Sequence, residues 1–94
     1  MVKGKTKSGI KFQINEAIKD DARLLYMLVQ LRSEEVSTED KGKIVFDLLT
    51  LVFGRDGIMP FMNAVAEKHD GVCTTEAMVT ELNEILESIN AKNS

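Results

Sequence analysis

Residues 44–53 constrain the fold of this chain more than any other segment. They contain only two polar residues, Asp47 and Thr50. On a helical wheel these two fall with Lys43 and Gly54 in one narrow stripe, and every other position is apolar. A helix that is apolar nearly all round is usually buried nearly all round. We therefore expect this helix to form the centre of the core, or to leave part of its surface for another chain.

Length and composition indicate one small globular domain. The chain has 94 residues, of which 44% are hydrophobic and 29% are charged, and such a mixture folds rather than staying disordered. At this length, folding buries roughly 60–65% of the surface of the unfolded chain, which permits one modest core. We expect a single domain over residues 1–94, with residues 1–8 as a flexible basic arm and residues 90–94 as a frayed tail.

Charge and cysteine content restrict the class of protein further. The net charge is −3, whereas a domain built to hold phosphate backbones usually has a positive balance. The single cysteine, Cys73, excludes an internal disulfide framework and favours an intracellular site. The sequence has no run of about 18 apolar residues that could span a membrane. No apolar signal core follows the N-terminal lysines, so we do not expect secretion.

The first element is expected to be a strand. Residues 10–14 alternate strictly, with Ile10, Phe12 and Ile14 on one face and Lys11 and Gln13 on the other. This period of two is typical of a half-buried strand. A single strand needs a partner, and we expect it to pair with the residues before it or with residues 72–74.

The first helix is expected to follow an acidic pair. Asp20 or Asp21 can cap it by accepting hydrogen bonds from its free N–H groups. The apolar residues after this cap recur at intervals of three, four and seven, which is helical spacing; they are Leu24, Leu25, Leu28 and Leu31. The polar residues 33–38 should end this helix.

The second helix contains the apolar segment described above. Ser37 or Thr38 can cap its N-terminus. Gly42 weakens its first turns, so we expect the firm part of the helix to begin at Lys43. Gly54 should end it, because glycine readily adopts the left-handed conformation that closes many helices.

Two further helices complete the expected fold. Asp56 can cap the third, and Pro60 is tolerated only in its first turn. Thr74 can cap the fourth, which carries one apolar stripe formed by Met78, Leu82, Ile85, Leu86 and Ile89. Glu81, Glu84 and Glu87 are expected to lie off this stripe. The predicted fold is mainly α, a compact bundle of about four helices with a short N-terminal β-strand or hairpin.

The sequence predicts no catalytic, cofactor-binding or metal site. His69 and Cys73 are four residues apart, but Gly71 between them should end the helix, and a closed zinc site needs more ligands of this kind. Adjacent carboxylates do not share a helix face, so the acidic pairs are expected at caps and on the surface. The glycines match neither a phosphate loop nor a dinucleotide fingerprint. We therefore expect a binding protein and not an enzyme.

The order of the segments resembles the small tail assembly chaperones of long-tailed phages and prophages. The resemblance rests on "SGIKFQINE", "DDARLLYML", the apolar helix ending in "LLTLVFG", and "DGVCTTEAMVTELNEILE". It covers about residues 8–88, and its motifs are structural rather than catalytic. The chain departs from the family at "RDGIMPF", where an acidic, glutamine-containing helix start is expected.

This resemblance implies a function in assembly. Proteins of the family bind the tape measure protein, a long apolar helical chain that sets tail length, and keep it soluble while tail tube protein polymerises around it. They act in the cytoplasm of the host bacterium and are absent from the finished virion. The physical basis would be capture of apolar helices. From the excess of apolar residues we expect the binding surface to include Phe46, Leu49, Phe53, Met59, Phe61 and Met62.

Two other functions stay open at this point. The N-terminal lysines could bind nucleic acid in a small regulatory protein, although the third helix offers only Asn63 and Lys68 to a DNA groove. The apolar second helix could instead form an interface between copies of this chain.

Overall fold

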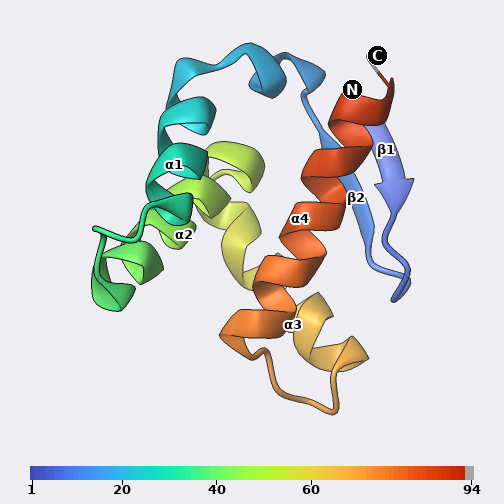
Figure 1. Ribbon diagram of the computed structural model, residues 1–94. Helices are drawn as coiled ribbons and strands as arrows, with labels where there is room; N and C mark the ends of the chain where they lie inside the picture. Colours follow the sequence, from blue (N-terminus) through green and yellow to red (C-terminus); the bar gives the residue numbers. More distant parts are fainter. Residues whose placement is uncertain (93–94) are drawn as a thin grey trace.

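The protein is described here by a computed structural model, which covers the backbone of residues 1–92 and the side chains of residues 1–89. It confirms the expected fold class: four α-helices and an N-terminal antiparallel hairpin form a compact unit with a radius of gyration of 12.9 Å. Figure 1 shows α4 crossing one face of the hairpin, while α1 and α2 lie on the other side of the molecule. The elements in chain order are β1 (Val2–Lys5), β2 (Lys11–Ile14), the short 3₁₀ helix η1 (Glu16–Asp20), α1 (Ala22–Arg32), α2 (Thr38–Phe53), the 3₁₀ helix η2 (Arg55–Gly57), α3 (Ile58–Lys68) and α4 (Thr75–Lys92).

The N-terminal segment is a strand and not a flexible arm. Residues of β1 pair with β2 so that Val2 lies opposite Ile14 and Gly4 opposite Phe12. Val2 is buried, with 2% of its surface exposed, and this burial holds in place the segment that was expected to be a flexible arm because of its three lysines. The ring of Phe12 covers Gly4 so closely that a Cβ atom there would lie 2.6 Å from it.

Helix α1 begins as expected. The side chain of Asp21 accepts a hydrogen bond from the backbone N–H of Arg23, which confirms the predicted cap. The Arg23 guanidinium also donates two hydrogen bonds to this carboxylate and lowers the pKa of Asp21 to about 2. The helix packs mainly against α2.

Helix α2 starts at one of the two predicted caps. Ser37 caps it by accepting from the N–H of Asp40, and the helix runs from Thr38 through Gly42 without a break. The first turns, which were expected to be weak before Lys43, are regular helix, because this cap and two acidic residues in the first turn outweigh the cost of one glycine. The helix ends at Gly54, whose φ of 77° confirms the expected glycine-dependent stop.

Helix α2 buries most of its apolar residues. Val45, Leu48, Leu49 and Val52 face the core, whereas Phe46 is 46% exposed. Ile44, Leu51 and Phe53 are partly buried, and the predicted polar stripe of Lys43, Asp47 and Thr50 is exposed. Of the two expectations for this helix, the structure therefore favours a place in the chain's own core, with Phe46 as its exposed apolar residue.

Helix α3 begins without the predicted cap. The 3₁₀ helix η2 leads directly into it, and its N-cap residue Gly57 makes no side-chain cap hydrogen bond, so Asp56 does not cap this helix. Pro60 lies in the first turn, as expected, where its missing N–H is not needed. Phe61 and Val65 are the residues that α3 buries.

Helix α4 confirms the predicted apolar stripe. The hydroxyl of Thr74 accepts from the N–H of Ala77 at 3.1 Å, and all five stripe residues are buried. The helix continues to Lys92, three residues into the segment expected to be frayed, and residues 93–94 lie outside the described part of the chain. Glu81, expected off the stripe, is only 1% exposed. Within the described residues, no helix combines the length with the apolar character that a membrane crossing requires.

Candidate binding groove between α1 and α4

The structure buries two of the six residues predicted to bind a partner. Leu49 is fully buried and Phe61 is 6% exposed, and both belong to the chain's own apolar core. Their prediction as part of an uncovered surface is wrong, because α2 and α3 turn these side chains into the core.

The other four predicted residues differ in exposure. Phe53 is partly buried and stacks on Phe61, with ring centroids 4.6 Å apart. Met62 is also partly buried against the core. Phe46 on α2 and Met59 on α3 are exposed. The six residues therefore do not make one exposed surface.

The exposed apolar surface that the sequence prediction missed lies on α1. Leu25, Tyr26 and Val29 are each more than half exposed, and Leu24 is the only buried residue of this helix. A signal was present in the sequence, since residues 24–31 contain one polar residue, Gln30. This segment is more uniformly apolar than residues 44–53. Apolar surface that the chain itself leaves uncovered is therefore to be sought on α1 more than on α2.

A groove runs between α1 and α4 beside these residues. Helix α1 packs on α2, whereas α4 packs on α3 and the hairpin, so α1 and α4 face each other across a hollow of about 410 Å³. The apolar residues of its walls are Leu28, Leu31, Val79 and Leu86. The wall from α4 spans residues 79–87, about 12 Å at 1.5 Å per residue, or slightly more than two helical turns.

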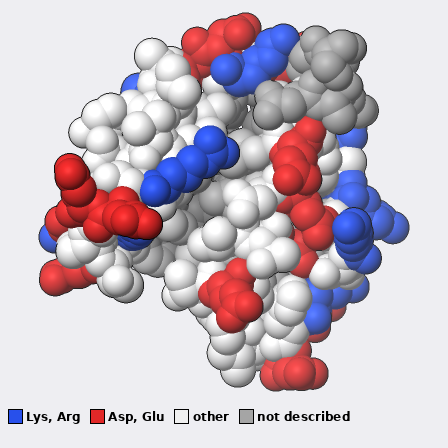
Figure 2. Space-filling view, viewed as in Figure 1, with Lys and Arg blue, Asp and Glu red and all other residues white. Residues whose placement is uncertain are grey.

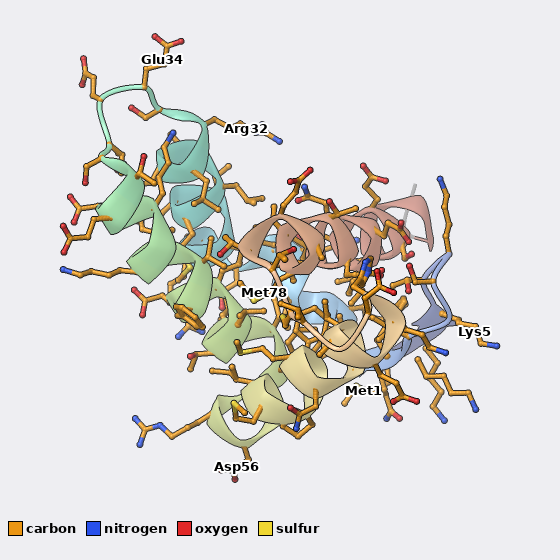
Figure 3. The ribbon with its side chains drawn as sticks, turned by 90° about the horizontal axis from the view of Figure 1, so that it is seen from below. Met1, Lys5, Arg32, Glu34, Asp56 and Met78 are labelled. Atoms are coloured by element: carbon orange, nitrogen blue, oxygen red, sulfur yellow. The ribbon has the colours of Figure 1, made fainter. Side chains whose placement is uncertain are left out.

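Polar side chains border the groove. Arg32 lines it from α1, and Asn83 and Glu87 line it from α4. Figure 3 shows Arg32 extending from the end of α1 toward the side on which α4 lies. Figure 2 shows that uncharged side chains cover most of the face between α1 and α4, with acidic side chains along α4. An apolar floor with a polar border is the composition of a groove that receives an amphipathic helix.

The groove continues onto the exposed surface of α1. Leu28 is three residues after Leu25, and Arg32 is three residues after Val29, so these four side chains are neighbours along one helix face. We call the groove and its extension, Leu25, Leu28, Val29, Leu31, Val79 and Leu86, the α1–α4 surface.

A buried polar cluster lies away from this groove, where the hairpin turn meets α3 and α4. Glu81 of α4 is paired with His69, which follows the last residue of α3, with Oε1 and Nε2 3.2 Å apart. Burial, the largest single influence, acts to raise the pKa of Glu81, but the hydroxyls of Ser8 and Thr6 together with His69 outweigh it and lower this pKa. The carboxylate is therefore charged at neutral pH.

The cluster ties the hairpin turn to the helices. Thr6 accepts a hydrogen bond from the N–H of Ile10 through its hydroxyl, and the backbone N–H of Lys7 donates to Glu84 at 2.9 Å. Oε2 of Glu81 has no partner of good hydrogen-bond geometry among the described residues. Glu81 lines none of the hollows described for this structure. We therefore interpret this cluster as a structural contact that holds the hairpin turn against the helices.

The remaining side chains that could act as nucleophiles or metal ligands do not form a cluster. Cys73 is partly buried, and burial raises the pKa of its thiol, which disfavours the reactive thiolate. Among the residues that the structure describes, no three His, Cys, Asp or Glu side chains gather as metal ligands.

Comparison with protein families, with curated proteins and with solved structures finds no match for this chain.

Proposed function

We propose that this protein is a tail assembly chaperone of a long-tailed phage or prophage. It binds an apolar helical segment of the tape measure protein and keeps that protein soluble while the tail tube assembles, with tail tube protein as a further partner. The proposal assigns the protein to the cytoplasm of the host bacterium, outside the finished virion, and gives it a binding rather than a catalytic role.

One observation carries the proposal: the α1–α4 surface leaves large apolar side chains uncovered beside an open groove. Leu25 and Val29 are 65% and 55% exposed on the same helix face. Burying a large apolar side chain is worth roughly 1.5–3 kcal/mol. A partner helix with apolar residues spaced by three and four would cover these side chains and the groove floor together. We identify this partner as the tape measure protein because the order of the sequence segments resembles that of the tail assembly chaperones.

Co-expression with a tape measure protein tests the proposal. The soluble fraction of the tape measure protein should rise, and the two chains should purify together. The Leu28→Asp, Val79→Asp double variant places two carboxylates in the groove and should abolish both effects, whereas Phe46→Asp, an exposed position on α2, should not. If the tape measure protein stays insoluble with the unaltered chain, the proposed function is wrong.

The same surface could instead hold a second copy of this chain. The two cases differ in a dilution series measured by light scattering, because self-association through α1 would give a mass that falls with concentration. A monomer at all concentrations that also solubilises the tape measure protein would support the chaperone function alone.

A further inference from the structure

The two walls of the groove carry charges of opposite sign. Helix α1 contains two arginines and no acidic residue, whereas residues 75–89 of α4 contain four glutamates and no basic residue. Arg23 is paired with Asp21 at the start of α1, while Arg32 lines the groove from the other end of that helix. Glu87 lines the groove from α4. The α1 wall is therefore positive and the α4 wall is negative.

A stripe of polar side chains follows the outer border of α4. Its four residues recur at intervals of four, three and four, so they lie on one side of the helix; they are Glu76, Thr80, Asn83 and Glu87. All four are exposed, and Asn83 and Glu87 line the groove. The stripe covers about 16 Å at 1.5 Å per residue, or about three turns. It therefore places a carboxylate at each end of the border along which a bound helix would lie.

The chain pairs a carboxylate on one flank of α4 and leaves those on the other flank unpaired. On the flank that meets the hairpin turn, Glu81 pairs with His69. On the groove flank, the side chains of Glu76 and Glu87 make no hydrogen bond or ion pair with another described residue, and the same is true of Arg32 across the groove. The charges of both walls are therefore available to a bound helix.

We propose that the groove recognises the flanks of the bound helix by their charge, with a basic flank against α4 and an acidic flank against α1. This inference rests on the proposed function, because it takes the α1–α4 surface to hold an amphipathic helix. The apolar stripe of that helix covers the groove floor, and its lysine or arginine side chains reach Glu76 and Glu87. A carboxylate on its opposite flank can accept two hydrogen bonds from the planar guanidinium of Arg32.

The opposite charges of the walls also select one direction for the bound helix. A helix that is turned end for end in the groove keeps its apolar stripe on the floor but exchanges its two flanks. The reversed helix would bring its acidic flank to the glutamates of α4 and its basic flank to Arg32, and like charges brought together oppose binding. The bound segment is therefore expected to run in one direction only.

Charge complementarity favours a partner helix over a second copy of this chain. The exposed apolar helix that a second copy could insert is α1, which contains no acidic residue to pair with Arg32. Nucleic acids and anionic membranes are also disfavoured, because the glutamates of α4 would repel their phosphate groups. The occupant that satisfies both walls is an amphipathic helix with one basic and one acidic flank.

Three synthetic helices of about 18 residues, which share one leucine stripe, test this recognition. The first has lysine on one flank and glutamate on the other, the second has glutamine on both flanks, and the third has glutamate on both. In calorimetric titrations of the full chain at low salt, the first should bind about tenfold more tightly than the second, because each exposed ion pair is worth up to about fivefold. The third should bind more weakly than the second. These differences should shrink at about 1 M salt, where the screening length is about 3 Å.

Variants of the chain assign the effect to the two walls. Arg32→Gln and Glu87→Gln should each reduce the preference for the first helix over the second by about two- to fivefold. Arg55→Gln and Glu67→Gln are the matched controls. They remove the same charges from exposed sites on η2 and α3 that line none of the described hollows, and they should leave this preference unchanged.

The direction of binding is measured separately. A nitroxide label at the N-terminus of the first helix should broaden the nuclear magnetic resonance signals at one end of the groove, either near Val79 or near Glu87. A fourth helix, in which the two flanks are exchanged, should bind equally well and should move the broadening to the other end. The same label on the glutamine helix should broaden the signals at both ends.

Four results would overturn the inference. They are equal binding of the first and second helices, equal effects of the control variants, broadening at both ends by the first helix, and tighter binding of a helix with lysine on both flanks than of the first. In each case, binding of the glutamine helix would leave the chaperone function standing. If none of the helices binds, the groove holds no apolar helix and the proposed function is wrong as well.

Discussion

Nε2 of His69 lies 3.2 Å from Oε1 of Glu81, and this pair joins three parts of the chain that are distant in sequence. His69 follows α3, Glu81 belongs to α4, and the hydroxyls of Thr6 and Ser8 reach the same carboxylate from the hairpin turn. The hairpin is therefore held to the helices by a charged group as well as by its apolar inner face.

Replacing this carboxylate should change the pH dependence of stability. The pKa of Glu81 is lowered in the folded chain, so its contribution is present above its ordinary value of 4.5 and is lost as the pH falls through the lower, folded value. Glu81→Gln should lower the free energy of unfolding by about 1.5–3 kcal/mol at neutral pH. The difference from the unaltered chain should shrink as the pH falls below 4.5, as measured by urea unfolding at a series of pH values.

Glu87→Gln is the control, because Glu87 is exposed on the same helix. It should cost less than about 0.5 kcal/mol at every pH. If Glu81→Gln lowers the free energy of unfolding by the same amount down to acid pH, the side chain contributes through its packing and not through its charge.

Two substitutions on α2 should separate core from surface. Leu49→Ala removes a fully buried side chain and should cost about 2–5 kcal/mol. Phe46→Ala, three residues earlier and 46% exposed, should cost about 1 kcal/mol or less. Guanidinium unfolding monitored by circular dichroism measures both. Equal losses would mean that Phe46 is covered as fully as Leu49.

Two glycines of the same helix should respond in opposite directions. Gly42 lies within α2 with open space around the position of a Cβ atom, so Gly42→Ala should stabilise the chain by about 0.5–1 kcal/mol. Gly54 has φ 77° and ψ 163°, a region almost restricted to glycine, so Gly54→Ala should cost about 1–3 kcal/mol. Thermal unfolding midpoints that move in the same direction would contradict the assigned end of α2.

Local signals in the sequence predicted the helices well. The caps at Asp21, Ser37 and Thr74 were among the predicted candidates, because a short side chain with an acceptor oxygen precedes each apolar pattern. The apolar stripe of α4 was also predicted, since its spacing alone defines one face. These features depend on residues within one or two turns of each other.

Features that depend on distant residues were not predicted. Glu81 is three residues after Met78 and four before Ile85, so it borders the stripe, but only the position of the hairpin turn decides that this flank is covered. The same holds for α1, whose apolar residues are exposed because α4 packs on the hairpin and on α3 instead. Val2 was assigned to a mobile arm because the lysines around it hid one buried position in four.

Polar substitutions on the exposed face of α1 should leave the fold intact. Leu25→Ser and Val29→Ser replace side chains that are more than half exposed, so together they should change the free energy of unfolding by less than about 1 kcal/mol. They should nevertheless weaken binding of an apolar helix several-fold, as measured by titration calorimetry. A large loss of stability would mean that these residues are covered within the chain.

The central claim is that the α1–α4 surface receives an apolar helix, and nuclear magnetic resonance tests it most directly. A synthetic amphipathic helix, with leucines spaced by three and four, is titrated into the isotopically labelled chain. We predict that the largest shifts fall on Leu28, Leu31, Val79 and Leu86 and that they are lost in the Leu28→Asp, Val79→Asp variant. Shifts confined to Phe46 and Met59, or no saturable shift at any residue, would contradict the account.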